Sequence, residues 1–295
     1  MNSINNVPAW NGKPQTRADA VLSFLTEARG ADASTTGKLL CNKAAYLFMR
    51  ATSRTPQRGW HTSARHWYRY PFSLFGEVLW SRQLEAWFRA ENEAAMESML
   101  HENNYEPVDW VAPNKGDVVL DVGAFVGWHT IRAAKLVGLS GRVISLEPDT
   151  VNRRQLEDNL KLNQITNCSV VPLGAWSTPH DNLGWYTEKS PDCCRIDVNK
   201  SASSEGIKAT TIDDLVAEIR LNRVHWIKMD IEGGEVEALK GAARTLRDYR
   251  PCVFVELHDT VQPVRELLKQ YGYCIKREAF DASPEPHGWF VAHSL

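Results

Sequence analysis

The chain has 295 residues, of which 43% are hydrophobic and 24% charged, and its formal net charge is −2. This composition is typical of a globular protein and excludes collagen-like and wholly disordered chains. No apolar run approaches the roughly 18 residues that a membrane helix needs. The first residues also lack the basic start and apolar stretch of a secretory signal. Six cysteines without a C-x-x-C pair favour reduced thiols, so we expect a cytoplasmic protein.

The first part of the chain contains a basic, aromatic segment. Between Ala33 and Gly76 there are seven Lys or Arg residues and no Asp or Glu, interleaved with aromatic side chains. Three interpretations stay open: a structural cap, a binding site for an anionic or ring-bearing small molecule, and a nucleic-acid-binding surface. We predict a separate N-terminal cap over residues 1–110 that is a candidate substrate-binding region.

From residue 111 the sequence alternates between short apolar, β-branched runs and stretches with helical spacing. The expected strands are residues 117–122, 142–148, 169–176, 224–231, 252–258, 273–278 and 288–295. The expected helices are residues 127–138, 151–163, 210–220, 235–249 and 261–272. This alternation predicts an α/β domain over residues 111–295, with right-handed βαβ units and a mostly parallel sheet covered by helices on both faces.

In such a fold, ligands bind outside the carboxyl ends of the strands. The first strand leads into Asp121, Gly123 and Gly127, a tight turn before a helix whose positive end suits an anionic group. Phe125 and Val126 stand where the dinucleotide pattern G-x-G-x-x-G needs glycine, so a pyrophosphate is a poor fit. A ligand with one carboxylate and an ammonium fits better, with Asp121 accepting from the ammonium. A plain strand-to-helix connection is the structural alternative.

The next two strands add features of a nucleoside site. The second strand ends in Glu147, and an acid at this place hydrogen-bonds a ribose diol. Its structural alternative is an acid that caps the following helix. Gly174 and Ala175, at the end of the third strand, would let an adenine lie close to the backbone. Together these features predict a nucleoside ligand without phosphates.

Acidic residues gather at the ends of the fourth and fifth strands. They are Asp230, Glu232 and Glu235, with Glu256 and His258 on the fifth strand. Such a set is also a candidate metal site, but its members come from separate strand ends rather than one ligand loop. We therefore predict no metal.

Several runs, taken in order, resemble the FkbM-type methyltransferases. These runs are VVLDVGAFVGWHT, SLEPD with NLKLN, TTIDDL, IKMDIEGGEVEALKG and FVELH. The resemblance covers roughly residues 105–275, and the fourth-strand run is its most specific part. It implies a class I enzyme that depends on S-adenosylmethionine (SAM), with a Rossmann-like, seven-stranded fold.

The resemblance also implies roles for individual residues. It makes Asp121, Gly123 and Gly127 the loop at the methionine end of the cofactor, with Ala124 and Phe125 between them. It makes Glu147 the ribose ligand, places Gly174 and Ala175 near the adenine, and puts Asp230 at the junction of cofactor and acceptor. One departure stands out: family members often have a small polar residue, typically Asn, at the position of Phe125.

If the acceptor is an alcohol, its proton must leave as the methyl group arrives. The candidates to take it are Asp230 and His258, the latter because an unperturbed pKa near 6.5 suits a base at neutral pH. A structural histidine oriented by Glu256 is the alternative for His258, and Asp230 is as well suited to positioning cofactor or acceptor. We expect His129 to pack or to shape the acceptor site.

The predicted function is O-methylation, with SAM, of a hydroxyl on a small molecule such as a sugar, polyketide, lipid or peptide. One alternative is an RNA or DNA methyltransferase. Enzymes that methylate base nitrogens commonly have an N/D-P-P-[YF] turn after the fourth strand, and this chain has DIEGG there, which argues against that alternative. Another is a SAM-binding module without activity. A homo-oligomer is compatible with the sequence. Short strand-like runs in the insert at residues 182–206 predict either a flap over the acceptor or a hairpin that extends the edge of the sheet.

Overall fold

The computed structural model describes residues 28–52, 73–81, 85–92, 95–96, 107–187, 194–196, 206–280 and 287–295. The chain divides into two compact units, Met1–Pro107 and Val108–Leu295. Residues 53–72, which hold Arg54, Arg58, Arg65 and Arg69 of the basic, aromatic segment, lie outside the described residues, as does Cys193. Among the described helices, none combines the length and apolar character needed to cross a membrane.

The first unit contains a helix and a small antiparallel sheet. Helix α2 (Ala33–Thr52) follows β1 (Ala28–Gly30), which pairs with β2 (Val78–Ser81), and β2 pairs with β3 (Ala86–Arg89). The carboxylate of Glu77 accepts a hydrogen bond from Thr35 Oγ1 (2.6 Å) and lies 2.5 Å from Lys38 Nζ. At least one lysine of the basic segment is therefore paired with an acid.

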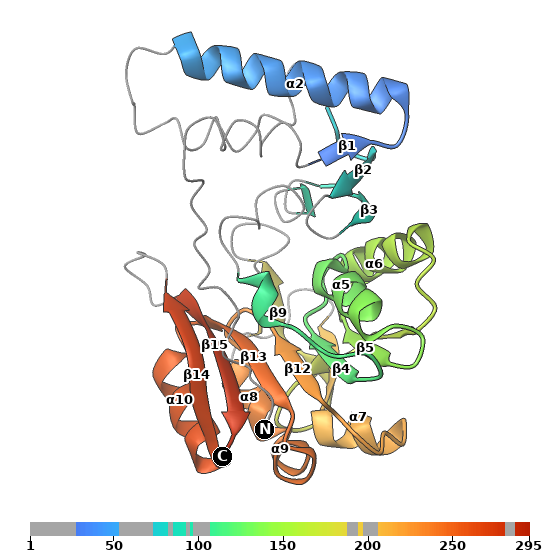
Figure 1. The fold of residues 1–295 in the computed structure, drawn as a ribbon. Helices are drawn as coiled ribbons and strands as arrows, with labels where there is room; N and C mark the ends of the chain where they lie inside the picture. The colour runs from blue at the N-terminus through green and yellow to red at the C-terminus, as the bar shows by residue number, and fades with distance from the viewer. Residues whose placement is uncertain are drawn as a thin grey trace. The chain divides into compact units, whose positions relative to one another are not determined.

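The second unit is built on a seven-stranded sheet (Figure 1). Its order is β14-β15-β13-β12-β4-β5-β6. The five strands from β6 to β13 run parallel, whereas β15 is antiparallel to both β13 and β14. The strands are β4 (Val118–Val122), β5 (Arg142–Leu146), β6 (Cys168–Val171), β12 (Trp226–Met229), β13 (Cys252–His258), β14 (Tyr273–Phe280) and β15 (His287–Ser294). The predicted fold class, a Rossmann-like and mostly parallel sheet, is confirmed.

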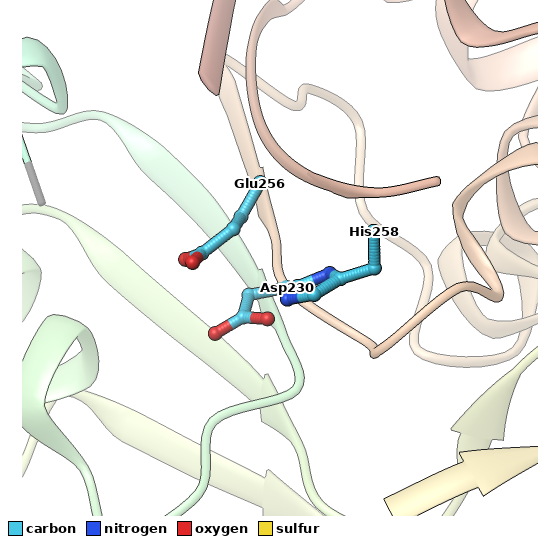
Figure 2. A group of neighbouring side chains, drawn as sticks. All are labelled: Asp230, Glu256 and His258. Atoms are coloured by element: carbon cyan, nitrogen blue, oxygen red, sulfur yellow. The ribbon is translucent and has the colours of Figure 1, made fainter. Parts of the chain in front are cut away.

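The two faces of the sheet are packed differently. Leu120 and Val122 of β4 face the larger core, which helices α7 (Ile212–Glu218), α8 (Glu235–Lys240), α9 (Ala243–Tyr249) and α10 (Val261–Gln270) share. On the other face, Val119 packs with residues of α5 (Trp128–Val137). Helix α6 spans Thr150–Leu162. Side chains alternate along a strand, so Asp121 lies on the α5 face. Glu256 and His258, two residues apart on β13, point toward Asp230 (Figure 2).

The predicted strand over residues 169–176 is wrong in one respect, because it is two strands in two sheets. Strand β6 ends at Val171, and β7 (Gly174–Ala175) pairs with β11 (Ile207–Thr210) in a separate sheet. Pro172 separates them, and proline cannot donate to a strand ladder.

The insert forms local sheets. Strand β8 (His180–Leu183) pairs with β11, and β9 (Trp185–Thr187) pairs with β10 (Cys194–Ile196). In the described part of the insert, these strands do not join the seven-stranded sheet. Strands β9 and β10 pair antiparallel but do not extend that sheet, so this part of the prediction is wrong, and the flap over the acceptor stays a prediction.

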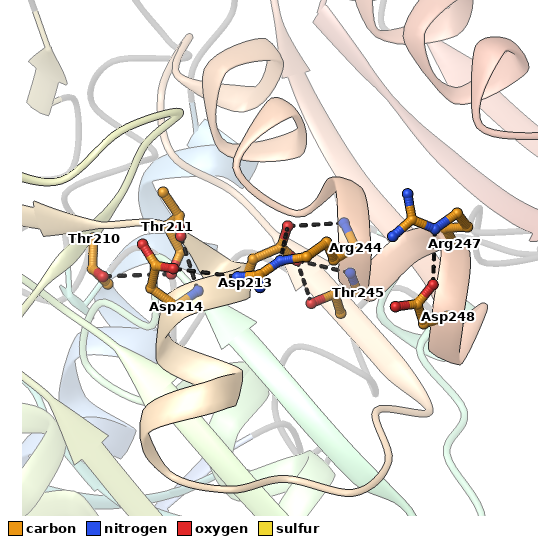
Figure 3. Close-up of polar contacts among 8 residues, drawn as sticks. All are labelled: Thr210, Thr211, Asp213, Asp214, Arg244, Thr245, Arg247 and Asp248. Atoms are coloured by element: carbon orange, nitrogen blue, oxygen red, sulfur yellow. Dashed lines mark hydrogen bonds and ion pairs between the residues drawn. The ribbon is translucent and has the colours of Figure 1, made fainter.

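The predicted single helix over residues 235–249 is wrong, because it is interrupted at Gly241. A Cβ at Gly241 would lie 2.1 Å from the carbonyl oxygen of Trp176. The carboxylate of Asp213 accepts hydrogen bonds from the backbone N–H groups of Arg244 (2.8 Å) and Thr245 (2.7 Å) (Figure 3). It therefore caps the first turn of α9, and the TTIDDL run has a structural role here.

Candidate functional site

Charged side chains form a row at the carboxyl ends of the central strands. Asp121 on β4 is directly opposite Lys228 on β12. Asp230 comes two residues after Lys228. Because Met229 pairs with Val255, the residues that follow them, Asp230 and Glu256, are neighbours at the ends of β12 and β13. Residues two apart on a strand share a face. The register therefore brings four charged side chains to one side of the sheet.

Lys228 occupies the centre of this row. Its side chain is 3% exposed, and its Nζ donates to the carbonyl oxygen of Gly123 at 3.0 Å. The same Nζ lies 3.5 Å from Asp121 Oδ1 and 3.9 Å from Asp230 Oδ2. Sequence reasoning missed this residue, although a lysine inside the apolar run VHWIKMDI was a signal, since a buried charge requires a partner.

The carboxylate of Asp121 is the most buried group of the row, with 1% of the side chain exposed. Its Oδ2 accepts a hydrogen bond from Thr130 Oγ1 at 2.5 Å, and that hydroxyl lies 2.9 Å from Ser145 Oγ. Its Oδ1 has no hydrogen-bond partner among the described residues. This oxygen is thus paired with Lys228 only at the 3.5 Å of an ion pair and can accept a further hydrogen bond.

The turn at residues 123–127 has an unusual backbone. Gly123 and Gly127 have φ values of 78° and 99°, and Phe125, which is not a glycine, has a φ of 48°. A Cβ at Gly123 would lie 1.8 Å from the carbonyl oxygen of Asp230. The N–H groups of Gly123 and Ala124 both donate to the Leu146 carbonyl (3.1 and 3.0 Å). These two N–H groups are therefore used within the protein and do not face an anion.

Glu147 fixes this turn to the end of β5. Its Oε2 accepts from the N–H of Phe125 (2.8 Å), and its Oε1 accepts from the N–H of Asp149 (2.9 Å). Phe125 thus contributes through its backbone. Burial raises the pKa of Glu147 to about 8, although both backbone N–H groups act in the opposite direction. Asp149, not Glu147, caps α6, because its side chain accepts from the N–H of Asn152 (2.7 Å).

His258 is held by a buried carboxylate. Its Nδ1 lies 3.2 Å from Glu235 Oε1, and its Nε2 lies 3.5 Å from Glu232 Oε2. Burial alone would lower the pKa of His258, but the hydrogen bond with Glu235 and the charge of nearby carboxylates outweigh it and raise the pKa to about 10. The ring is therefore protonated at neutral pH, which disfavours the base role expected from an ordinary histidine pKa. The orienting acid is Glu235 rather than the expected Glu256.

The other predicted residues are not members of this row, although His129 lies close to it. His129, on the first turn of α5, is buried, and burial with the charge of Lys228 lowers its pKa to about 3. The neutral ring lies 6.1 Å from that of Phe254, measured between centroids, as expected for a packing residue. Gly174 and Ala175 are buried in β7, and their role beside an adenine stays a prediction.

Comparison with known families decides the assignment. Residues 121–275, more than half of the chain, match the model of the methyltransferase FkbM domain. The chain belongs to the FkbM methyltransferase family. The match confirms the resemblance seen in the ordered runs. The cofactor of this FkbM methyltransferase is S-adenosylmethionine.

Individual proteins also match this FkbM chain. Hexuronic acid methyltransferase AglP of Haloferax volcanii is 29% identical over 161 residues, which are 52% of this chain and 62% of that protein. The chain thus spans less than two thirds of that relative. The crystal structure of methyltransferase FkbM from Methylobacillus flagellatus has 18% identity and a TM-score of 0.42, covering 93% of this chain and 58% of that one. Aeropyrum pernix fibrillarin with bound SAM has 14% identity and a TM-score of 0.41, covering 68% and 74%.

Proposed function

We propose that this FkbM protein transfers the methyl group of SAM to a hydroxyl oxygen of a small molecule. The observation that carries the proposal is the position of Asp230. Its backbone carbonyl packs against Gly123 of the glycine turn, while 33% of its side chain is exposed. One residue thus borders both the cofactor turn and the space in front of the sheet.

The residues of the turn fit SAM. Asp121 Oδ1 is buried, forms no hydrogen bond among the described residues and lies 3.5 Å from Lys228 Nζ, so it is an acceptor suited to an ammonium group. A Cβ at Gly123 would collide with the Asp230 carbonyl oxygen (1.8 Å) and one at Gly127 with the Leu156 side chain (2.6 Å), so both glycines let the turn pack closely against its neighbours. Glu147 lies at the end of the neighbouring strand with both carboxylate oxygens directed by backbone N–H groups. We assign Asp121 to the ammonium and Glu147 to the ribose diol.

When bound, SAM supplies the reactive carbon as a sulfonium methyl group. The protein aligns the acceptor, and alignment contributes roughly 7–11 kcal/mol where the geometry is near-attack. Asp230 is the group that we assign to take the hydroxyl proton, because its carboxylate is partly exposed and His258 is already protonated at neutral pH. Lys228 fixes the position of Asp230 and of the Gly123 carbonyl.

The acceptor class can be tested directly. AglP acts on a hexuronic acid, so sugar acids and neutral sugars are the first acceptors to try, followed by extracts, with SAM labelled in its methyl group. We expect a labelled small-molecule ether by mass spectrometry. Label in RNA or DNA would favour the nucleic-acid alternative, and SAM binding by calorimetry without any labelled product would favour the non-catalytic one. A labelled ester or amine would contradict the hydroxyl as acceptor.

In the same assay, Asp230→Asn serves as the control on the site. We expect it to lower turnover by about 10²–10⁴-fold while SAM affinity changes little, since only proton removal is lost. Asp158→Asn, which neutralises an exposed acid on α6, should leave turnover unchanged. Equal rates in all three proteins would exclude Asp230 as the proton acceptor.

Glu147 makes nucleoside binding depend on pH. The ionised carboxylate accepts the ribose hydroxyls better than the neutral acid, and the pKa of Glu147 is about 8. Affinity should therefore rise with pH below that value, by up to about tenfold per unit, and level off above it. 5′-Methylthioadenosine is the suitable ligand, because it keeps the ribose but lacks the titrating amino group of SAM. Calorimetry between about pH 6 and pH 9 measures the slope.

The control for this prediction is Glu147→Ala. It should weaken binding by about 1–3 kcal/mol at high pH, through the unpaired diol, and remove the pH dependence. An identical slope in the variant would show that another group titrates.

A further inference from the structure

The ends of β12 and β13 bring together a histidine and two carboxylates (Figure 2). Asp230, Glu256 and His258 each offer one ligand atom, and these atoms all lie within 4.8 Å of one another. Donors that share one metal ion at about 2.0–2.2 Å lie roughly 3–4 Å apart. Small side-chain rotations would therefore place all three around a single ion.

A second observation concerns the ring of His258. Its Nδ1 contacts the carboxylate of Glu235, which is fully buried and also accepts from Thr260 Oγ1 (2.8 Å) and the N–H of Gly233 (2.8 Å). Metal-binding histidines usually donate their second ring N–H to such a carboxylate, which fixes the ring and its tautomer. Nε2, which lies 3.5 Å from Glu232 Oε2, is then the ring atom that would bind the cation, with release of its proton to solvent.

The charge around the ring favours a cation. Asp230, Glu232, Glu235 and Glu256 surround His258 with four carboxylates. Lys228 is shared between Asp121 and Asp230 at distances above 3 Å from both. Carboxylates that lie so close together repel one another, and a divalent cation relieves that repulsion.

We propose that Asp230, Glu256 and His258 bind one divalent transition-metal cation of the Mn²⁺ class. One imidazole with two carboxylates suits Mn²⁺, Fe²⁺ or Zn²⁺, whereas Mg²⁺ and Ca²⁺ prefer sites made of oxygen alone. This departs from the expectation of no metal, which rested on the separation of these residues in the sequence. The strand register removes that separation.

The site is compatible with the role assigned to Asp230. A carboxylate has two oxygens, so binding a cation through one leaves the other for the acceptor. The proposal concerns binding alone and requires neither SAM nor an acceptor. Its failure would therefore leave the proposed methyl transfer untouched, and the reverse also holds.

The test is a titration of the purified full chain with Mn²⁺, in which electron paramagnetic resonance measures the free ion. Glu256→Gln and His258→Asn each remove one ligand while keeping side-chain shape. Glu237→Gln, which removes a partly exposed acid of α8 paired with Lys240, is the matched control for non-specific binding. Thermal unfolding without metal shows which variants are folded.

We expect one Mn²⁺ per chain in the wild type and in Glu237→Gln, and affinity weakened by at least about tenfold in each ligand variant. Added Mn²⁺ should also raise the melting temperature of the wild type but not of Glu256→Gln. Equal binding in all four proteins, or no binding in the wild type, would overturn the proposal. So would Mg²⁺ displacing Mn²⁺ at equal concentration, because that result indicates a site of oxygen ligands only.

Discussion

Replacing Lys228 by methionine is expected to lower the free energy of unfolding by about 3–5 kcal/mol. The change keeps the volume of the side chain but leaves Asp121, with 1% of its side chain exposed, without its positive partner. Breaking one side of a buried ion pair is costly because an uncompensated charge stays in a low-dielectric environment. Denaturation by urea, monitored by circular dichroism, measures the loss.

Two variants separate this effect from simple loss of a lysine. Lys240→Met removes a half-exposed lysine paired with Glu237, and such surface pairs contribute about 0–1 kcal/mol. Combining Asp121→Asn with Lys228→Met should cost less than the two single changes added together, since the unpaired charge is then absent. If Lys228→Met cost no more than Lys240→Met, the central place of Lys228 in the row would be refuted.

Gly123→Ala is expected to be similarly disruptive, at about 2–5 kcal/mol. The left-handed φ of 78° contributes about 1–2 kcal/mol of this. Overpacking contributes about 1–3 kcal/mol more, because the new Cβ would lie 1.8 Å from the Asp230 carbonyl oxygen. The same collision separates β4 from the end of β12, so SAM affinity should fall as well. Urea denaturation and calorimetry with SAM measure the two effects.

Gly138→Ala is the matched control for the backbone alone. Gly138 ends α5 with a φ of 63° and a ψ of −174°, a backbone region open essentially to glycine alone, and has nothing within 4 Å of its would-be Cβ. The variant should therefore lose only the backbone contribution, of the order of 1–3 kcal/mol, and keep SAM affinity. Equal losses in stability and affinity for the two variants would show that the close approach to Asp230 has no energetic weight.

Much of the fold follows from local patterns in the sequence. The apolar, β-branched runs predict the five parallel strands of the main sheet because buried parallel strands are mostly apolar, with Asp121, Lys228 and Glu256 as the charged exceptions. One error occurs where distant residues contribute: Asp213 caps the first turn of α9, and the carbonyl of Trp176 leaves no space for a Cβ at Gly241, between α8 and α9. The other error, over residues 169–176, depends on Pro172 within the run itself.

The candidate site was predictable to about the same extent as the fold. Strand ends identified the turn at residues 123–127, Glu147 and the acids near Asp230, because a parallel sheet collects its carboxyl ends at one edge. Register was not predictable, and register pairs Lys228 with Asp121. The pKa of His258 was equally hidden, since it depends on Glu235, a fully buried carboxylate 23 residues earlier in the chain.

The contact between Lys228 and Gly123 has a consequence for the order of folding. It joins residues 105 positions apart in the chain. Strands β4, β5 and β6 can pair as soon as they are synthesised, and Leu146 and Glu147 at the end of β5 then hold the glycine turn. The Gly123 carbonyl gains its partner Lys228 only when β12 docks against β4. Such long-range closure is slow because the entropy of the intervening chain is lost before the new contacts stabilise the sheet. A nascent chain that has not yet been synthesised as far as Lys228 therefore lacks this contact between β4 and β12, and a ligand that binds only the completed sheet stabilises only that form.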